Sequence, residues 1–144
     1  MILNTQIVDI IPQRFSCRTY QKRHIEEDAR QSLVDFMART RVGPLGSNHR
    51  FELIAATQAD MTALRGLGTY GFIKGASGFI VGAMKDYQKN LEDFGYGMQA
   101  VILKATELGL GTCWLGGTFS KSNFARKVAL QENETIPAVT SIGY

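Results

Sequence analysis

Apolar residues recur with a helical period in two long stretches of the chain. In residues 25–39 they stand three and four positions apart, and the acidic run from Glu26 to Asp28 favours a helix N-terminus. In residues 90–108 apolar side chains occupy nearly every face, which is typical of a helix buried in a core or at a subunit interface. We predict a helix over each stretch, and a short one over residues 4–11 that ends at Pro12.

Two glycines interrupt the longer of these helices. Gly95 and Gly97 each cost about 1 kcal/mol of helix propensity relative to alanine. We therefore expect another element to pack closely against both positions and to offset that cost.

Short apolar runs between turn-forming residues predict strands over 51–56, 78–84 and 138–144. The run 78–84 contains no polar side chain, so we expect this strand to be buried on both faces. Short helices are expected over 60–67 and 122–130. We expect a loop over 42–48, and the glycines between positions 66 and 75 predict a flexible connector.

Composition narrows the class of protein. A length of 144 residues suits one domain, and the net charge of +3 comes from basic residues mixed with acids, which argues against a nucleic-acid binder. No apolar run is long enough to cross a membrane, and the first residues lack the pattern of a secretory leader. Cys17 and Cys113 form neither a metal pattern nor a disulfide framework, so we expect reduced thiols and a cytoplasmic protein.

The stretch from Arg14 to Tyr20 places basic and hydroxyl side chains at alternate positions. In an extended backbone, Arg14, Ser16 and Arg18 point to the same side. Two guanidinium groups beside a hydroxyl can bind a phosphate dianion through charge-assisted hydrogen bonds, each worth about 1.5–3 kcal/mol. A solvated basic face is the alternative interpretation of the same pattern.

A glycine-rich segment follows the long helix. Gly109 suits a helix C-cap, and we expect a turn from there to Gly117. The segment is not a dinucleotide fingerprint, because Trp114 stands where the third glycine would be required. The pair Gly116 and Gly117 would let backbone N–H groups approach a flat ligand, with Trp114 and Leu115 as apolar walls.

Together the two motifs resemble those of the FMN-dependent nitroreductase superfamily. Arg-x-Ser-x-Arg-x-Tyr (14–20) precedes the long apolar helix and Gly-Leu-Gly-Thr-Cys-Trp-Leu-Gly-Gly (109–117) follows it, as in the branch labelled "putative TM nitroreductase". The resemblance covers nearly the whole chain. It implies an α+β fold in which helices flank a mixed or antiparallel central sheet, with one long, buried central helix. Residues 1–144 would form a single domain of this kind, or the N-terminal half of a two-half arrangement.

The resemblance also implies a cofactor site. The first motif of the family holds the FMN phosphate, which places Arg14, Ser16 and Arg18 in that role and agrees with the charge argument. The glycine-rich segment of the family donates backbone hydrogen bonds to the flavin N5 and O4. That role falls on Gly116 and Gly117.

Two further positions are implied by the resemblance alone. Leu115 would lie against the flavin ring. Ser47 and Asn48 stand where many members carry a Ser-x-x-Asn-x-Gln-Pro loop that reaches the flavin, although this chain has His49 and Arg50 in place of the final Gln-Pro.

The implied function is an enzyme that passes electrons from NAD(P)H through FMN to an electron-poor acceptor such as a nitroaromatic or a quinone. The cofactor does the chemistry, so we expect no catalytic side chain and no metal. The C-terminal basic pair of classical members is missing, so we expect a homodimer or a complementary second chain to complete the site. The alternative is a non-catalytic FMN-binding or dimerisation module with the same fold.

Overall fold

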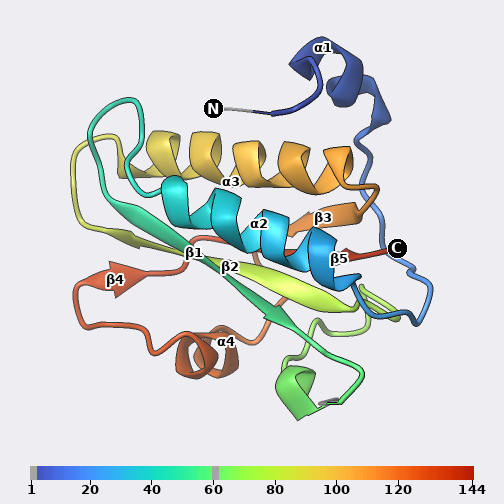
Figure 1. The fold of residues 1–144 in the computed structure, drawn as a ribbon. Helices are drawn as coiled ribbons and strands as arrows, with labels where there is room; N and C mark the ends of the chain where they lie inside the picture. The colour runs from blue at the N-terminus through green and yellow to red at the C-terminus, as the bar shows by residue number, and fades with distance from the viewer. Residues whose placement is uncertain (1–2, 60–61) are drawn as a thin grey trace.

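A computed structural model of the chain describes residues 3–59 and 62–144 and shows an antiparallel sheet between layers of helices (Figure 1). The strand order is β1-β2-β5-β3, and β4 pairs with the end of β2. The strands are β1 (His49–Ala55), β2 (Gly78–Lys85), β3 (Gly111–Leu115), β4 (Glu134–Thr135) and β5 (Val139–Gly143). This arrangement is the α+β class that the sequence predicted.

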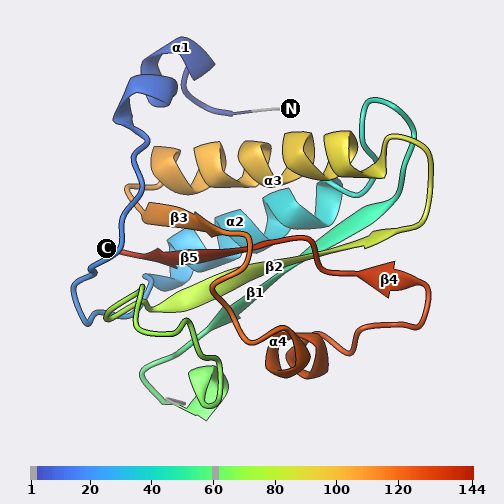
Figure 2. The ribbon, with the colours of Figure 1, turned by 180° about the vertical axis from the view of Figure 1, so that it is seen from behind.

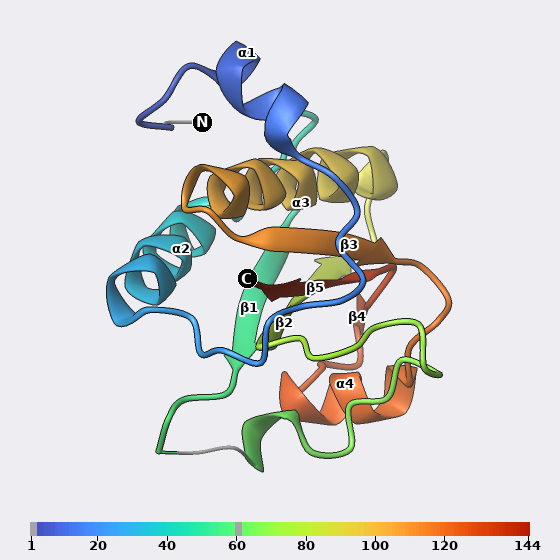
Figure 3. The ribbon, with the colours of Figure 1, turned by 90° about the vertical axis from the view of Figure 1, so that its right-hand side faces the viewer.

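Helices cover both faces of the sheet (Figure 3). On one face lie α2 (Glu27–Arg39) and α3 (Asn90–Glu107), and on the other lies α4 (Lys121–Lys127). The short helix α1 (Ile7–Ile10) runs on into a 3-10 turn over Ile11–Gln13 and contacts α3. None of the described helices combines the length and apolar character that a membrane span requires.

The central strand β2 supplies side chains to the cores on both faces. Ile80 and Met84 pack in the cluster under α2 and α3, whereas Phe79 and Val81 pack in the cluster under α4. Successive side chains of a strand point to opposite faces, so an all-apolar strand can serve two cores. The prediction that this strand is buried on both faces is confirmed, since only its last residue, Lys85, is exposed.

Most predicted elements lie where the hydrophobic period placed them. The helices predicted over 25–39 and 90–108 are α2 and α3, and the strand predicted over 138–144 is β5. The helix predicted over 60–67 is a 3-10 turn at Thr62–Leu64, and positions 60–61 lie outside the described residues. The two-residue strand β4 was not predicted, because it is too short to carry a period.

The prediction of a turn over 109–117 is wrong for its middle. Gly109 ends α3 with a φ of +78°, but the chain then forms the five-residue strand β3 against β5. The glycines at both ends favoured a turn in the prediction. The run between them, Thr112 to Leu115, is a strand whose successive side chains enter two different layers. The turn is confined to the bends that follow Leu115.

Of the two glycines within α3, only Gly97 is packed against another element. A Cβ at Gly97 would lie 2.7 Å from Nε2 of His49 and 3.0 Å from Cε2 of Phe51, so the absence of a side chain lets α3 approach β1 closely. A Cβ at Gly95 would meet nothing within 4 Å. The expected packing neighbour is therefore present at Gly97 and absent at Gly95.

Asp93 fastens the loop before β1 to the first turn of α3. Its fully buried carboxylate accepts hydrogen bonds from the N–H of Leu45 and the N–H of Ser47, each at 2.8 Å, and from the Ser47 hydroxyl at 2.7 Å. Burial alone would raise the pKa of Asp93, but these hydrogen bonds outweigh it and the pKa is lowered. The loop is therefore held against α3 by an ionised carboxylate.

The two glycines of α3 provide a matched pair of substitutions. Gly97→Ala should lower the free energy of unfolding by about 1–3 kcal/mol, because the new methyl group would collide with His49 and Phe51. Gly95→Ala should raise it by about 0.5–1 kcal/mol through helix propensity alone. Urea unfolding of both variants measures the difference, and equal effects at the two positions would contradict the packing described here.

Candidate functional site

The segment from Arg14 to Tyr20, called the arm below, runs extended across the start of β3 (Figure 3). The N–H of Cys17 donates to the carbonyl of Thr112 at 2.8 Å. Further along, the N–H of Lys74 donates to the carbonyl of Arg18, and the N–H of Tyr20 donates to the carbonyl of Lys74, both at 2.9 Å. The arm is thus fixed to an edge strand and to the loop that precedes β2.

Tyr20 anchors the end of the arm in the core. Its ring is buried, and its hydroxyl shares a 2.8 Å hydrogen bond with the hydroxyl of Ser141 on β5. Burial raises the pKa of Tyr20, so the phenol stays protonated and able to donate. Gly143 leaves the room for the ring, because a Cβ there would lie 2.9 Å from Cδ1 of Tyr20.

Side-chain directions alternate over only part of the arm. Ser16 and Arg18 are exposed, and Cys17 between them turns inward against Gly111. Tyr20 has the same spacing as Ser16 and Arg18 but points into the core, because the arm changes its backbone partner from Thr112 to Lys74. The face predicted for residues 14, 16 and 18 is exposed at Ser16 and Arg18 and half-buried at Arg14, and it ends before Tyr20.

The basic side chains of the arm are free to bind an anion. Arg14 is half-buried and Arg18 is exposed, and neither makes an ion pair or a side-chain hydrogen bond to any residue that the structure describes. Lys74, which the sequence did not single out, is a backbone partner of Arg18 and is also exposed. Only its place between glycines at 71 and 75 could have pointed to it.

Gly116 and Gly117 lie at the other end of β3 and present open backbone. A Cβ at either position would meet nothing within 4 Å, and both residues are exposed. Gly116 is four positions beyond Thr112, which lies beside the arm, and this spacing is about 13 Å at the rise of an extended strand. An elongated ligand with an anionic end and a flat end could contact both places.

Leu115 does not present its side chain to a ligand. It is 4% exposed and packs with Phe79, Phe119 and Phe124 under α4. The role implied for it as a surface against a flat ring is corrected accordingly, because strand alternation turns residue 115 into the core. Trp114 points to the opposite face, where its indole N–H donates to Oε1 of Gln99 at 3.1 Å and part of the ring is exposed.

The loop that precedes β1, which contains positions 47 and 48, lies at the opposite end of α3 from the arm (Figure 2). Both positions precede β1 beside the first turn of α3, whereas the arm passes beyond its last turn, and the 18 residues of α3 span about 27 Å. The Ser47 hydroxyl is buried and committed to Asp93, which corrects the expectation that it is available to a ligand. Asn48 is exposed.

His49 is buried, and neither ring nitrogen has a hydrogen-bond partner among the described residues. Its ring centroid lies 5.0 Å from that of Phe51. Burial lowers the pKa of His49, and the nearby Asp93 carboxylate only partly opposes this. His49 is therefore a neutral core residue.

The hydrogen-bond donors at the two ends of β3 suit a molecule that carries a phosphate ester at one end and a flat aromatic ring at the other. Free guanidinium groups suit a phosphate, and open glycine amides suit the polar edge of a flat ring. FMN has both features, so the residues present fit that cofactor. No group of His, Cys, Asp and Glu suited to a metal ion occurs among residues 3–59 and 62–144.

Comparisons with known proteins identify the family and the fold. Residues 6–144 match a family described as "Putative TM nitroreductase". No curated protein sequence matched the chain. Among solved structures, a nitroreductase with bound FMN from Desulfitobacterium hafniense superposes with a TM-score of 0.73 at 18% identity, covering 99% of this chain and 90% of its own.

Two further structures have the same fold at low identity. A nitroreductase family protein from Clostridium difficile gives a TM-score of 0.72 at 21% identity, covering 97% of this chain and 84% of its own. A Bacteroides thetaiotaomicron protein described as a "putative NADH dehydrogenase/NAD(P)H nitroreductase" gives 0.72 at 20% identity, covering 99% and 88%.

The pH dependence of the free energy of unfolding should reveal the lowered pKa of His49. Because its pKa is lower in the folded than in the unfolded chain, the unfolded state gains a proton as the pH falls through the ordinary value of 6.5, and folding loses stability. Urea midpoints should therefore fall between about pH 7.5 and pH 5.5. Carboxylates with lowered pKa, such as Glu134, act mainly below the ordinary 4.5.

Two variants separate this effect from other titrations. His49→Leu should flatten the fall in the urea midpoint, whereas His24→Gln, at the other histidine, should preserve it. If His24→Gln flattened the pH profile and His49→Leu did not, the pKa direction given for His49 would be wrong.

Proposed function

The chain belongs to the "Putative TM nitroreductase" family, and we propose that it is an FMN-dependent oxidoreductase that passes electrons from NAD(P)H to an electron-poor acceptor such as a nitroaromatic or a quinone. The family and the FMN of the D. hafniense structure support the cofactor. The description of the B. thetaiotaomicron protein supports a nicotinamide donor.

One observation carries the proposal: free cations on the arm stand about one strand length from open glycine amides. Arg14, Ser16 and Arg18 would hold the phosphate, with Lys74 adding positive charge. Backbone N–H groups at Gly116 and Gly117 would donate to the polar edge of the ring system. Such donors stabilise negative charge that develops on the ring during reduction.

Bound FMN would supply the redox chemistry itself. The part left to this chain is to bind and orient, because the described residues contain no cluster suited to a metal ion and the site contains no Ser-His-Asp arrangement. The arm is rigid enough for that task, since three backbone hydrogen bonds and the buried Tyr20 fix it.

A second copy of this chain would complete the site. Ser47 and Asn48 lie at the far end of α3 from the arm, so only a partner could bring that loop beside it. Both α3 and the N-terminal segment, whose helix α1 contacts it, expose large apolar side chains: Val8, Ile11, Phe15, Leu91 and Tyr96. We propose a homodimer through this surface, and a cytoplasmic location, where Cys17 and Cys113 stay reduced.

Titration with FMN tests the cofactor site. Arg14→Gln and Arg18→Gln should each weaken FMN binding roughly tenfold or more, because each removes a charge-assisted contact to phosphate. Arg65→Gln removes one charge elsewhere on the surface and should leave the affinity within about twofold. Equal affinities for all three variants would remove the phosphate assignment.

Adding NADH or NADPH without oxygen tests the reaction. Loss of the visible flavin absorbance, and its return when a quinone or nitroaromatic is added, is the expected result. A protein that binds FMN but is bleached by neither nicotinamide would be the non-catalytic FMN-binding module instead.

Light scattering tests the dimer. We expect twice the chain mass across a concentration series, and a shift toward monomer in Tyr96→Arg, which places a charge on the apolar surface. Lys121→Ala, at an exposed position on α4, is the control and should stay dimeric. A monomer at every concentration would contradict the proposed assembly.

A further inference from the structure

A basic cavity lies at the opposite end of the sheet from the arm. It has a volume of about 260 Å3 and is bounded by the loop before β1, the end of β2, and the segment that leads into β4. We call it the β4 pocket. Its lining residues are Arg41, Asn48, His49, Arg50, Lys85, Gln131 and Glu134.

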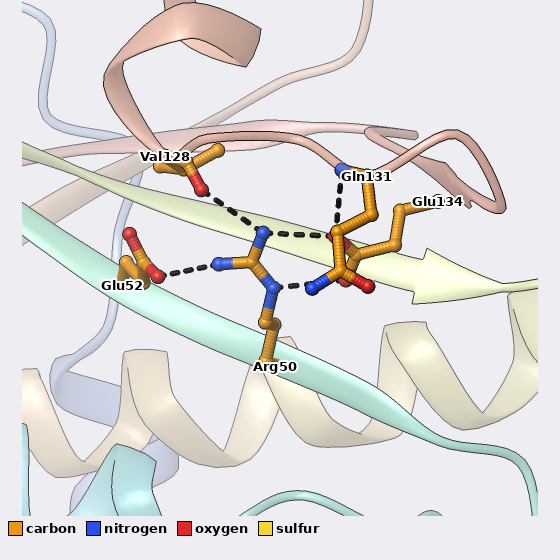
Figure 4. A network of polar contacts seen from close by, with 5 residues as sticks. All are labelled: Arg50, Glu52, Val128, Gln131 and Glu134. Atoms are coloured by element: carbon orange, nitrogen blue, oxygen red, sulfur yellow. Dashed lines mark hydrogen bonds and ion pairs between the residues drawn. The ribbon is translucent and has the colours of Figure 1, made fainter.

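The one carboxylate of the β4 pocket is already neutralised (Figure 4). Glu134 is buried, and its two oxygens accept from Nε and Nη2 of Arg50 at 2.8 and 2.9 Å. One of them also accepts from the N–H of Gln131 at 3.1 Å. This bidentate ion pair lowers the pKa of Glu134 and leaves it little capacity to bind another cation.

Arg50 is equally committed. Besides Glu134, its guanidinium donates to the carboxylate of Glu52 and, at 3.0 Å, to the carbonyl of Val128 (Figure 4). Arg50 is therefore shared by two carboxylates, and Arg50, Glu52 and Glu134 together form a rigid floor of the pocket with one net negative charge.

Two cations of the lining have no such partner. Arg41 and Lys85 are exposed, and neither forms an ion pair or a side-chain hydrogen bond within the described part of the chain. Lys85 stands opposite Glu134 in the β2–β4 register, and its charge helps to lower the pKa of Glu134, although no ion pair joins their side chains. His49 adds no charge when neutral. The pocket thus carries an excess of positive charge.

Backbone hydrogen bonds hold the walls of the pocket together. The N–H of His49 donates to the carbonyl of Arg41 at 3.0 Å, and the N–H of Lys85 donates to the carbonyl of Asn48 at 3.2 Å. The segments that carry Arg41 and Lys85 are thereby joined through residues 48 and 49. Cations on preformed walls bind an anion with little loss of backbone freedom.

From this geometry we propose that the β4 pocket is a binding site for a dianionic phosphate group. Arg41 supplies a planar guanidinium and Lys85 a compact ammonium, and the side-chain amides of Asn48 and Gln131 add neutral donors. The shared chemistry belongs to free phosphate and to phosphate monoesters alike. The arm and the β4 pocket share no residue, although Asn48 of the lining also belongs to the loop that we propose to lie beside the partner's arm.

Calorimetry on the full chain at constant ionic strength tests the site, with inorganic phosphate, phenyl phosphate and acetate as probes. Both phosphates should bind more tightly than acetate. In NMR spectra of the same titration, the amides of Asn48, Lys85 and Glu134 should shift. Binding of inorganic phosphate without phenyl phosphate would assign the site to the free ion, and binding of both would assign it to monoesters as well.

Three variants locate the binding. Arg41→Gln and Lys85→Gln should each reduce the phosphate affinity roughly tenfold, and both side chains are exposed, so the fold should persist. Arg39→Gln removes a charge two positions from Arg41 but outside the lining, and should change the affinity by no more than about twofold. If phosphate bound no better than acetate, or if the three variants behaved alike, the proposal would be overturned. Shifts confined to the arm would overturn it too.

Discussion

The pairing of the arm with its two neighbours is the constraint on which the proposed cofactor site depends. The backbone of Cys17 is hydrogen bonded to β3, and the backbones of Arg18 and Tyr20 are hydrogen bonded to Lys74. A segment without regular secondary structure is thereby held in place by backbone hydrogen bonds. The phenol of Tyr20, which is hydrogen bonded to Ser141 in the core, fixes the register of the arm against the sheet. Charged groups on a fixed backbone lose little freedom when they bind, which favours affinity.

The length of α3 separates the arm from the loop before β1, and close packing of α3 on the sheet holds the two apart. Gly97 lets the helix approach His49 and Phe51, and Asp93 fastens the loop before β1 to its first turn. The arm and the loop of Ser47 and Asn48 therefore lie at opposite ends of one rigid helix. This separation is why a second chain enters the proposal, and why the β4 pocket is distinct from the arm.

The sequence predicted well the elements that carry a long or continuous apolar pattern, and it predicted poorly the contacts between elements. Apolar spacing identified α2 and α3, and short apolar runs between turn-forming residues identified β2 and β5. It could not show that Tyr20 would turn inward, since that depends on a change of backbone partner from Thr112 to Lys74. Nor could spacing show that the hydroxyl of Ser47 is consumed by Asp93, 46 positions away. Residue type was therefore enough to find candidate binding residues, but only the structure showed which of their side chains are free to bind a ligand.

A crystal structure of the chain with FMN tests the central claim most directly. The phosphate should lie within hydrogen-bond distance of Arg14 and Arg18, about 2.7–3.2 Å between heavy atoms, and the ring edge should meet the N–H groups of Gly116 and Gly117. A flavin bound elsewhere, with the arm and the two glycines free of ligand in the assembled protein, would contradict it.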